Sequence, residues 1–450
     1  MPATRDELRR LLALAAPMVV TQLGAMSLVV VDTLMVGRVG VDALAAAALG
    51  GTWVMGTLVV GMGLVLGLDP IVTQAHGAGD GPRLGLALQR GLVLAVLASL
   101  PIALVWALTG PVLILLGQEP RLAALAHDYV VVQIPGIAPF LAFVALRQVL
   151  QGRGLAAPAM WVTLGANLIN VAGNALLIFG GLGLPALGLV GAGLATTLTR
   201  FALLLGLLAW IRAFGLLDGV WIPWRRGAAA LAGLREIIAY GAPVAVQLAL
   251  EMWAFQVTTL LAGRMGAAAL AAHTIVLNVA SLTFMVPLGV SMAAVTRVGN
   301  LLGAARPRDA QRAAWLALAL GAGAMAAAAH AFITLGPAIP RLYSDDPAVV
   351  ALAAGLLPIA AAFQLFDGTQ VVGGGILRGM GRTRPAALFN LLGYYALGLP
   401  LAVLLAFRQG LGVHGLWWGL SLALGVIALA LLLYIARRGP ARARAAGAPS

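Results

Sequence analysis

The sequence contains no cysteine and no lysine, and it has few charged residues of either sign. The lack of cysteine excludes disulfides, thiolate metal sites and cysteine nucleophiles. Charged residues make up only 10% of the chain, against about 25% in ordinary soluble proteins. Disorder is excluded as well, because it needs low hydrophobicity and high charge, whereas 62% of these 450 residues are hydrophobic. The composition is that of an integral membrane protein.

Long apolar runs make up most of the sequence. A membrane-spanning helix needs about 20 mostly apolar residues. The first run is too long for a signal-peptide core, so we expect it to be retained as a membrane helix. The longest connector, 212–236, lies at the midpoint of the chain and is predicted to be a linker. The twelve predicted spans are 11–36, 43–68, 84–108, 129–150, 158–180, 187–211, 237–262, 267–295, 310–335, 349–374, 384–407 and 412–436.

The arginines predict the orientation of these spans. With both termini placed inside, 22 arginines lie on the inner side, five lie outside and Arg200 falls within a span. Positively charged residues are enriched in cytoplasmic loops, so this distribution predicts cytoplasmic termini and an even number of spans. The same rule explains the net charge of +13. Nucleic-acid binding is not expected, because no segment could form a soluble basic domain.

The second half of the sequence repeats the first at an offset of 226 to 227 residues. The longest match aligns GRVGVDALAAAAL at 37–49 with GRMGAAALAAHTI at 263–275. Each half holds six spans, so both halves enter the membrane in the same direction. Repeats of this kind commonly flank the substrate pathway of secondary transporters. Single residues aligned by the offset are Pro17 with Pro243, Gly63 with Gly289, Gly77 with Gly303, Pro158 with Pro385 and Gly188 with Gly415.

These features predict an all-α polytopic membrane protein with twelve transmembrane helices. The helices form two six-helix lobes related by a pseudo-two-fold axis along the membrane normal. We expect an N-lobe at 1–211, a cytoplasmic linker at 212–236, a C-lobe at 237–436 and an Arg-rich cytoplasmic tail at 437–450. The sequence carries no Walker loop, no HExxH motif and no cysteine, so we do not expect an enzyme. A passive channel is an alternative, although duplicated lobes with offset carboxylates suit alternating access better.

Several motifs run through the sequence in order and in both halves. They are APMVVTQ…VDTLMVGRVG…ALAAAALG, GLDPIVTQAHGAGD, QGRG…P, NLINVAGNALLIFGG and AAHTIVLNVASLTFMVPLGVSMAAVTRVGNLLGA. Together, from about residue 8 to 435, they resemble the multidrug and toxic compound extrusion (MATE) transporters, specifically the NorM-like branch. The resemblance implies two lobes around a V-shaped cavity that opens alternately to either side. It also implies export of amphipathic, often cationic compounds, driven by inward flow of Na⁺ or H⁺ with no other cofactor, from a bacterial inner membrane. We expect a monomer surrounded by membrane lipid.

Two acidic residues in the second half are candidates for a cation site. An ionised side chain at the bilayer centre costs about 2.5–3.5 kcal/mol on insertion scales, so such residues usually face a cavity or a partner. Glu251 lies near the middle of span seven, with Gln247 and Phe255 on the same helix face. Asp367 lies in span ten, three residues after Gln364. The resemblance matches both acids with the family's C-lobe cation site. A protonated, hydrogen-bonded glutamate and a structural ion pair are the alternatives.

The first half carries a different set of polar residues inside its spans. Asp32 lies in the outer half of span one, and Asn167, Asn170 and Asn174 recur at helical spacing along span five. Polar side chains on one face of a membrane helix must meet water, an ion or another helix. In the family, the matching Asp and Asn positions form an N-lobe proton-linked or cation site. Hydrogen bonding between helices is the alternative.

Four further polar residues are candidates for a supporting role. Arg200 lies about mid-span in the sixth helix, where we expect it to pair with a carboxylate such as Asp69 or to extend towards the inner face. Asp69 is a candidate gate residue, with a helix cap or an ion pair as the alternative. His273 and Asn278 match the family pattern, and a satisfied interior histidine is the alternative for the former.

The predicted function is secondary active export of amphipathic organic cations in exchange for Na⁺ or H⁺. Carboxylates with amide neighbours serve either ion, so Na⁺ at Glu251, Asp367 or Asp32 and protonation of these groups both stay open. A lipid-linked precursor flippase of the same superfamily or a narrow-specificity metabolite exporter is the alternative. Flippases usually offer a basic cavity, whereas the mid-span charges here are mostly acidic. A major-facilitator transporter usually carries a Gly-Asp-Arg motif that QAHGAGDGPR lacks.

Overall fold

The computed structural model describes residues 2–442, and this part of the chain is helical. The predicted tail at 437–450 is described only as far as Arg442, and the rest of it lies outside the described residues. The twelve predicted spans are confirmed, because twelve helical segments are long and apolar enough to cross a membrane. These segments are Thr4–Gly37, Val41–Gly77, Gly81–Ala107, Pro120–Gly152, Ala157–Phe179, Gly188–Ala213, Leu231–Gly263, Ala267–Gly303, Pro307–Thr334, Pro347–Gly379, Thr383–Arg408 and Gly412–Arg442.

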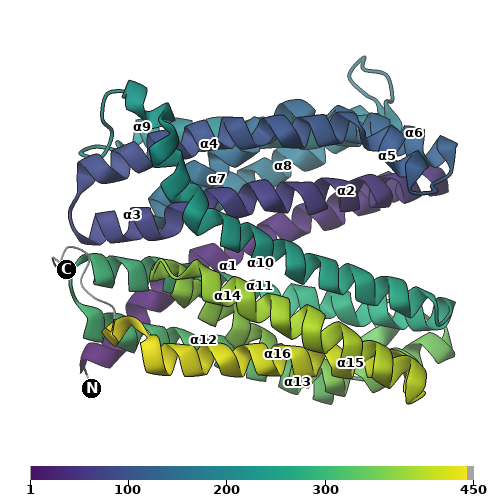
Figure 1. The fold of residues 1–450 in the computed structure, drawn as a ribbon. Helices are drawn as coiled ribbons and strands as arrows, with labels where there is room; N and C mark the ends of the chain where they lie inside the picture. The colour runs from purple at the N-terminus through teal and green to yellow at the C-terminus, as the bar shows by residue number, and fades with distance from the viewer. Residues whose placement is uncertain (1, 443–450) are drawn as a thin grey trace. The chain divides into compact units, whose positions relative to one another are not determined.

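The individual helices follow one another with short connections (Figure 1). In the first half of the chain they are α1 Pro2–Gly37, α2 Val41–Val65, α3 Leu68–Gly77, α4 Gly81–Ala107, α5 Thr109–Leu115, α6 Pro120–Val131, η1 Ile134–Gly136, α7 Ile137–Gly152, α8 Ala157–Phe179, α9 Gly188–Ala213 and η2 Arg226–Ala229. In the second half they are α10 Leu231–Gly263, α11 Ala267–Gly303, α12 Pro307–Thr334, η3 Pro340–Leu342, α13 Pro347–Gly379, α14 Thr383–Asn390, η4 Leu391–Gly398, α15 Leu399–Val403, η5 Leu404–Arg408, α16 Gly412–Arg438 and η6 Pro440–Arg442.

The chain divides into two compact units, and two long helices contribute to both. Unit 1 consists of the chain up to Val19, Gly77–Gly79 and the chain from Val246 onwards. Unit 2 consists of Val20–His76 and Asp80–Ala245. Helix α1 therefore begins in unit 1 and continues in unit 2, and α10 begins in unit 2 and continues in unit 1. The predicted lobe boundaries at 211 and 237 stay a prediction.

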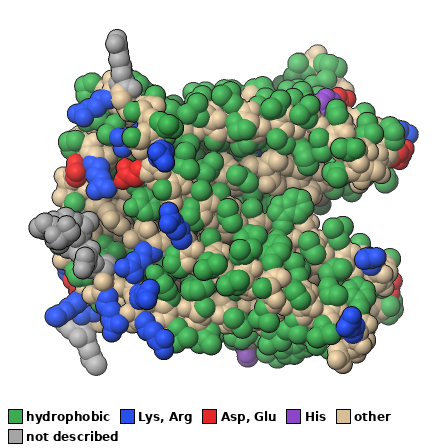
Figure 2. Space-filling model, viewed as in Figure 1, with side chains coloured by type: hydrophobic (Ala, Val, Ile, Leu, Met, Phe, Trp, Pro, Cys, Tyr) green, Lys and Arg blue, Asp and Glu red, His purple; other side chains and the backbone are tan. Residues whose placement is uncertain are grey.

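Within each unit the helices pack side by side. In unit 1, α11 and α12 both pack against α13, which also contacts α16. In unit 2, α8 packs against α9, and α4 and α9 both contact α7. Hydrophobic side chains cover much of the helix surfaces, while in each unit the Arg side chains gather mostly towards one end of the helices (Figure 2). This distribution is typical of membrane-spanning helices, whose polar ends lie outside the hydrocarbon layer.

The internal repeat extends to the closest backbone contacts. A Cβ atom on Gly63 of α2 would lie 2.3 Å from the Cα of Ala245 in α10. A Cβ atom on Gly289 of α11 would lie 2.8 Å from the Cα of Val19 in α1. The offset of 226 residues relates both partners of the first contact to both partners of the second. Small residues permit such close helix approach in membranes, and the two halves of the chain use it at the same place.

Three of the predicted spans are not continuous α-helices. The second is interrupted at Leu66–Gly67, between α2 and α3. The fourth span is broken between α6 and α7 around Pro135, which lacks the N–H group that a continuous helix needs. The eleventh span includes two π-helical segments, Leu391–Gly398 and Leu404–Arg408. A π-helical turn is wider than an α-helical turn and is frequent at functional sites. The break in the fourth span places Gln133 against Arg200, and the first π-helical segment places Tyr394 beside Phe255.

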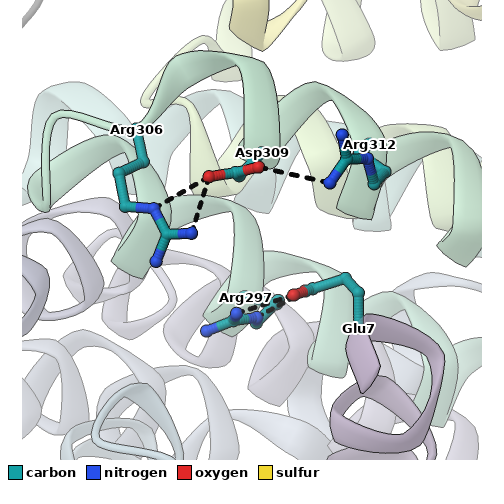
Figure 3. A network of polar contacts seen from close by, with 5 residues as sticks. All are labelled: Glu7, Arg297, Arg306, Asp309 and Arg312. Atoms are coloured by element: carbon teal, nitrogen blue, oxygen red, sulfur yellow. Dashed lines mark hydrogen bonds and ion pairs between the residues drawn. The ribbon is translucent and has the colours of Figure 1, made fainter. Parts of the chain in front are cut away.

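Two groups of polar contacts in unit 1 lie on α1 and α11 and at the beginning of α12 (Figure 3). Arg297 of α11 donates two hydrogen bonds to the carboxylate of Glu7 in α1, at 2.5 and 2.7 Å. The two side chains are only 15% and 11% exposed. Asp309 bonds Arg306 at 2.8 Å and Arg312 at 3.5 Å. The first of these contacts fixes the beginning of α1 to α11.

Candidate cation-coupling sites

A polar cluster in unit 1 surrounds Glu251, which α10 places opposite α13 and the end of α14. The carboxylate of Glu251 accepts hydrogen bonds from Gln370 at 3.3 Å and from Asn390 at 3.5 Å. The amide of Gln370 also lies 3.3 Å from the side-chain oxygen of Asn390. Both amides are fully buried, and Glu251 is half-buried. We call Glu251, Asp367, Gln370 and Asn390 the C-cluster.

Asp367 supplies the second carboxylate of the C-cluster. It lies one helical turn before Gln370 on α13, is only 5% exposed and interacts electrostatically with Glu251. One of its oxygens, Oδ1, is buried with no hydrogen-bond partner among the described residues. Within residues 2–442, neither Glu251 nor Asp367 forms a salt bridge with a basic side chain. The C-cluster therefore holds two acids without a cation of the protein.

Aromatic rings line one side of the C-cluster. Phe255 lies one turn after Glu251 on α10, and its ring centroid is 6.0 Å from that of Phe363 and 6.2 Å from that of Tyr394. The ring of Phe363 in turn packs edge-on against Trp417 at 5.4 Å. Such rings exclude water and attract organic cations through their faces. Tyr394 belongs to the π-helical segment, and its buried hydroxyl has no hydrogen-bond partner among the described residues.

A second polar cluster, in unit 2, surrounds Asp32 of α1. Asn174 donates to one carboxylate oxygen of Asp32 at 2.5 Å, and the hydroxyl of Thr196 lies 3.4 Å from the other. Asn174 also bonds Asn170 at 3.1 Å, and both asparagines are fully buried. We call Asp32, Asn170, Asn174 and Thr196 the N-cluster. The structure thus brings together the three N-lobe residues on which the sequence prediction rested most.

Asn167, the fourth predicted N-lobe residue, has another contact. Its amide donates a hydrogen bond of 2.7 Å to the backbone carbonyl of Gly24 in α1. Asn167 therefore joins α8 to α1 one helical turn from the N-cluster. This contact fits the alternative interpretation of the asparagines, in which they form hydrogen bonds between helices.

The predicted supporting residues of unit 2 lie at different places. Arg200 donates to the side chain of Gln133 at 3.2 Å and to its backbone carbonyl at 3.4 Å, and it forms no salt bridge within residues 2–442. Asp69 is buried, accepts a hydrogen bond from Gln148 and interacts electrostatically with Arg147. The contacts of Arg200 therefore differ from the predicted pairing with Asp69.

The remaining predicted residues of unit 1 lie around the C-cluster. Gln364, fully buried on α13, donates to the carbonyl of Ala280 at 3.3 Å and to the hydroxyl of Thr283, both on α11. His273 is also fully buried and shares a hydrogen bond of 3.1 Å with Thr259. These two residues join helices around the C-cluster, and their hydrogen bonds go to groups other than its carboxylates.

Gln247 and Asn278 complete the predicted set. The amide nitrogen of Gln247 lies beside Gly374 of α13, where a Cβ atom would be 3.3 Å away. This places Gln247 one turn before Glu251, next to the helix that carries Asp367. The side chain of Asn278 is exposed, so it does not belong to the buried part of the cluster.

Sequence reasoning missed Asn390 and Thr196 as site residues. The internal repeat carried a signal for the first, because the offset of 227 aligns Asn390 with Thr163 and Tyr394 with Asn167. The polar stripe of span five therefore recurs in span eleven at two of its positions. No comparable signal points to Thr196, whose counterpart in the second half is Ala423.

Both clusters offer oxygen ligands for a small cation or a proton. The C-cluster combines two carboxylates with two amides, and the N-cluster combines one carboxylate with two amides and a hydroxyl. Oxygen ligands suit hard cations, whereas transition metals favour nitrogen and sulfur. Within residues 2–442, no group of three or more His, Cys, Asp or Glu side chains could hold a metal ion.

The chain is similar to known proteins in both sequence and fold. The chain is 40% identical to a probable multidrug resistance protein NorM from Bradyrhizobium diazoefficiens, over 95% of this chain and 93% of that protein. It is 35% identical to the multidrug resistance protein PmpM of Pseudomonas aeruginosa, over 96% of this chain and 92% of that protein. The crystal structure of the eukaryotic MATE transporter AtDTX14 superposes with a TM-score of 0.89, at 25% identity and with 98% of each chain covered.

The family model for MatE matches the chain twice, at residues 17–176 and 243–404. The matches begin at Pro17 and Pro243, the two prolines that the sequence offset aligns. The internal duplication inferred from sequence is therefore confirmed by the family model. With two matches that cover most of its length, this chain belongs to the MATE family of membrane transporters and is not an enzyme.

Proposed function

We propose that this protein exports amphipathic organic cations from the cell in exchange for an inward flow of H⁺ or Na⁺. Ion-coupled multidrug efflux is the function that its family membership gives it. The C-cluster is the site at which the coupling ion and the organic cation compete. In a cycle of alternating access, a ligand shifts the two states only by its differential affinity for them. Neutralising Glu251 or Asp367 would favour one state and release the bound drug.

The pair of acids in the C-cluster, Asp367 buried and Glu251 half-buried, carries this proposal. Two ionised carboxylates cannot lie together in a low-dielectric site without a counter-charge, because each desolvated charge costs several kcal/mol. Since the described residues provide no salt-bridge partner, the counter-charge must come from outside the protein. A proton, a Na⁺ ion or an organic cation meets this demand, and the aromatic rings of Phe255 and Phe363 suit the last of these.

The same proposal assigns the membrane context. We place the chain in a bacterial inner membrane as a monomer, with both termini in the cytoplasm. The arginine-rich connections support this orientation, because in each unit most Arg side chains gather towards one end of the helices (Figure 2).

The test is efflux of ethidium from liposomes that contain the purified protein. A Na⁺ gradient and a pH gradient are imposed separately, and ethidium fluorescence reports movement. We expect transport under one gradient, which identifies the coupling ion, and loss of transport in Glu251→Gln. Thr369→Ala is the matched control, because Thr369 is half-buried on α13 and its hydroxyl donates to the carbonyl of Leu365 on the same helix. If a broad panel of organic cations moved under neither gradient, the proposal would be wrong and a lipid flippase or a narrow-specificity exporter would be favoured.

A further inference from the structure

Arg200 is a buried cation that the proposed transport cycle does not explain. Its side chain is only 7% exposed, on a helix that spans the membrane. The guanidinium group lies over the rings of Trp106 at 5.4 Å and Phe140 at 5.8 Å. Its hydrogen bonds go to Gln133, a neutral residue. An arginine stays charged in proteins, so unit 2 holds a permanent positive charge without a carboxylate in direct contact.

The surrounding fold holds this charge in place. The break in the fourth span, between α6 and α7, presents both the side chain and the carbonyl of Gln133 to the guanidinium group. A Cβ atom on Gly136 would lie 2.9 Å from the Cδ of Arg200, so only glycine leaves room for the side chain there. Thr197 follows Thr196 on α9, and its hydroxyl donates a hydrogen bond of 2.8 Å to the carbonyl of Val132. Arg200 is thus fixed at one point of unit 2.

That point is close to the N-cluster. Thr196, whose hydroxyl contacts Asp32, precedes Arg200 by four residues on α9, so both side chains lie on one helix face. Arg200 and Asp32 interact electrostatically, and Tyr129 interacts with both. The other groups that face Asp32, namely Asn170, Asn174 and Thr196, are neutral. Ionised Asp32 therefore already has a counter-charge in the protein, in contrast to the acids of the C-cluster.

Building on the proposed function, we propose that Arg200 determines the ion specificity of the N-cluster by excluding metal ions and organic cations from Asp32. A fixed positive charge lowers the affinity of Asp32 for every added cation, but the result differs between a proton and Na⁺. A carboxylate binds a proton with an affinity of about 10⁴ M⁻¹ even in water, whereas it binds Na⁺ only weakly. An equal electrostatic loss therefore removes Na⁺ binding and leaves proton binding measurable. The two clusters then have separate tasks, because only the C-cluster accepts a Na⁺ ion or a drug.

The test measures binding of ²²Na⁺ to the purified full-length protein. The parent variant carries Glu251→Gln and Asp367→Asn, so that the C-cluster contributes no binding. We expect no saturable binding to this parent and a gain of one saturable site, at least tenfold above the parent, when Arg200→Gln is added. Arg200→Lys keeps the charge and should behave like the parent. Adding Asp32→Asn to the Arg200→Gln variant should remove the gained site.

A structural role of Arg200 would not produce this gain, because misfolding does not create a Na⁺ site that depends on Asp32. Arg200→Met is a second variant, which fills the space between Trp106 and Phe140 without charge, in case the glutamine variant does not fold. Folded Arg200→Gln or Arg200→Met protein without Na⁺ binding would overturn the proposal. The proposal would also be overturned if the parent variant, with Arg200 unchanged, bound Na⁺ saturably and lost this binding when Asp32→Asn was added. Ethidium efflux by the unmodified protein tests the transport function separately.

Discussion

The two halves of this transporter share the same close helix contacts, which we call the frame, and differ in the charged residues inside their spans. Gly63 approaches Ala245 in unit 2 as Gly289 approaches Val19 in unit 1, and the sequence offset relates these contacts. The polar clusters do not follow the repeat. The offset aligns the charged residues with uncharged ones, namely Asp32 with Thr258, Glu251 with Ala25, Asp367 with Phe140 and Arg200 with Ile427. After duplication, packing was kept and ion chemistry diverged.

The difference in charge gives the clusters different needs. The C-cluster holds two acids; among the described residues two amides donate to Glu251, and Oδ1 of Asp367 has no hydrogen-bond partner. The N-cluster holds one acid, with Arg200 close enough to act on it electrostatically. A cluster that lacks a counter-charge must take one from solution, whereas a compensated cluster need not. The symmetry of helix packing therefore does not indicate which cluster binds the drug. The number of uncompensated acids in each cluster is the better indicator.

The largest effect should come from the acids of the C-cluster. We expect Glu251→Gln and Asp367→Asn each to reduce coupled ethidium transport by about 100-fold or more, because either removes the demand for a cation. The double variant should be no worse than the single ones, since residues that act as a unit are not additive. Proteoliposome efflux measures all three, and Thr369→Ala should stay within about twofold of the unmodified protein. Independent, multiplicative losses would argue against a shared site.

A second acid in the N-cluster should make it resemble the C-cluster. Asn174→Asp changes the residue that bonds Asp32 at 2.5 Å into a carboxylate of the same shape. Two facing acids exceed the single charge of Arg200, so we expect saturable ²²Na⁺ binding in the variant with a neutral C-cluster. Asn174→Ala removes the same hydrogen bond without adding charge and should not bind Na⁺. Binding by the alanine variant would show that the lost hydrogen bond, and not the charge, was decisive.

The sequence predicted the frame well because the membrane restricts it strongly. Apolar runs of about 20 residues in a lipid bilayer form helices, since every backbone group must be bonded internally. The structure extends several spans beyond their predicted ends, as in α13, which continues to Gly379 where 374 was expected. The π-helical turns at Leu391–Gly398 were not expected. These features depend on tertiary contacts rather than on hydropathy.

The site was predicted in part, because an acid in a membrane span is conspicuous and its partners are not. Asp32, Glu251 and Asp367 followed from the cost of burying charge. Asn390 and Thr196 belong to helices that the sequence could not place beside these acids. Arg200 was expected either to pair with a carboxylate such as Asp69 or to extend towards the inner face, and its hydrogen bonds go to Gln133. The charge of Arg200 suggested an acidic partner, but the break in the fourth span presents the side chain and the carbonyl of Gln133 to it instead.

The shared frame should respond in the same way in both halves. We expect Gly63→Ala and Gly289→Ala each to lower the free energy of unfolding by about 1–3 kcal/mol, because the added methyl group meets backbone atoms. Gly51→Ala on α2 is the control, since nothing lies within 4 Å of its Cβ position. Alanine is favoured over glycine within a helix by about 1 kcal/mol, so this variant should be at least as stable. Thermal unfolding in detergent compares the three, and a loss in one half alone would show that the frames are not equivalent.

The smallest effect should come from an arginine that, unlike Arg200, has an acidic partner. Arg297 bonds Glu7 through two hydrogen bonds at 2.5 and 2.7 Å, with both side chains slightly exposed (Figure 3). Exposed pairs contribute up to about 1 kcal/mol, and breaking buried ones costs about 3–5 kcal/mol. This pair lies between the two cases, so we expect Glu7→Gln to lower the free energy of unfolding by about 1–2 kcal/mol.

A double-mutant cycle with Arg297→Gln separates the pair from its surroundings, because the second substitution should then cost little more than the first. Additive losses would contradict direct coupling between Glu7 and Arg297. The informative contrast is with Arg200. Removing the charge of Arg297 should reduce the melting temperature and leave ²²Na⁺ binding unchanged, since its charge is already matched by Glu7. Removing the charge of Arg200 should change ²²Na⁺ binding, so the two arginines distinguish a charge that stabilises the fold from one that selects an ion.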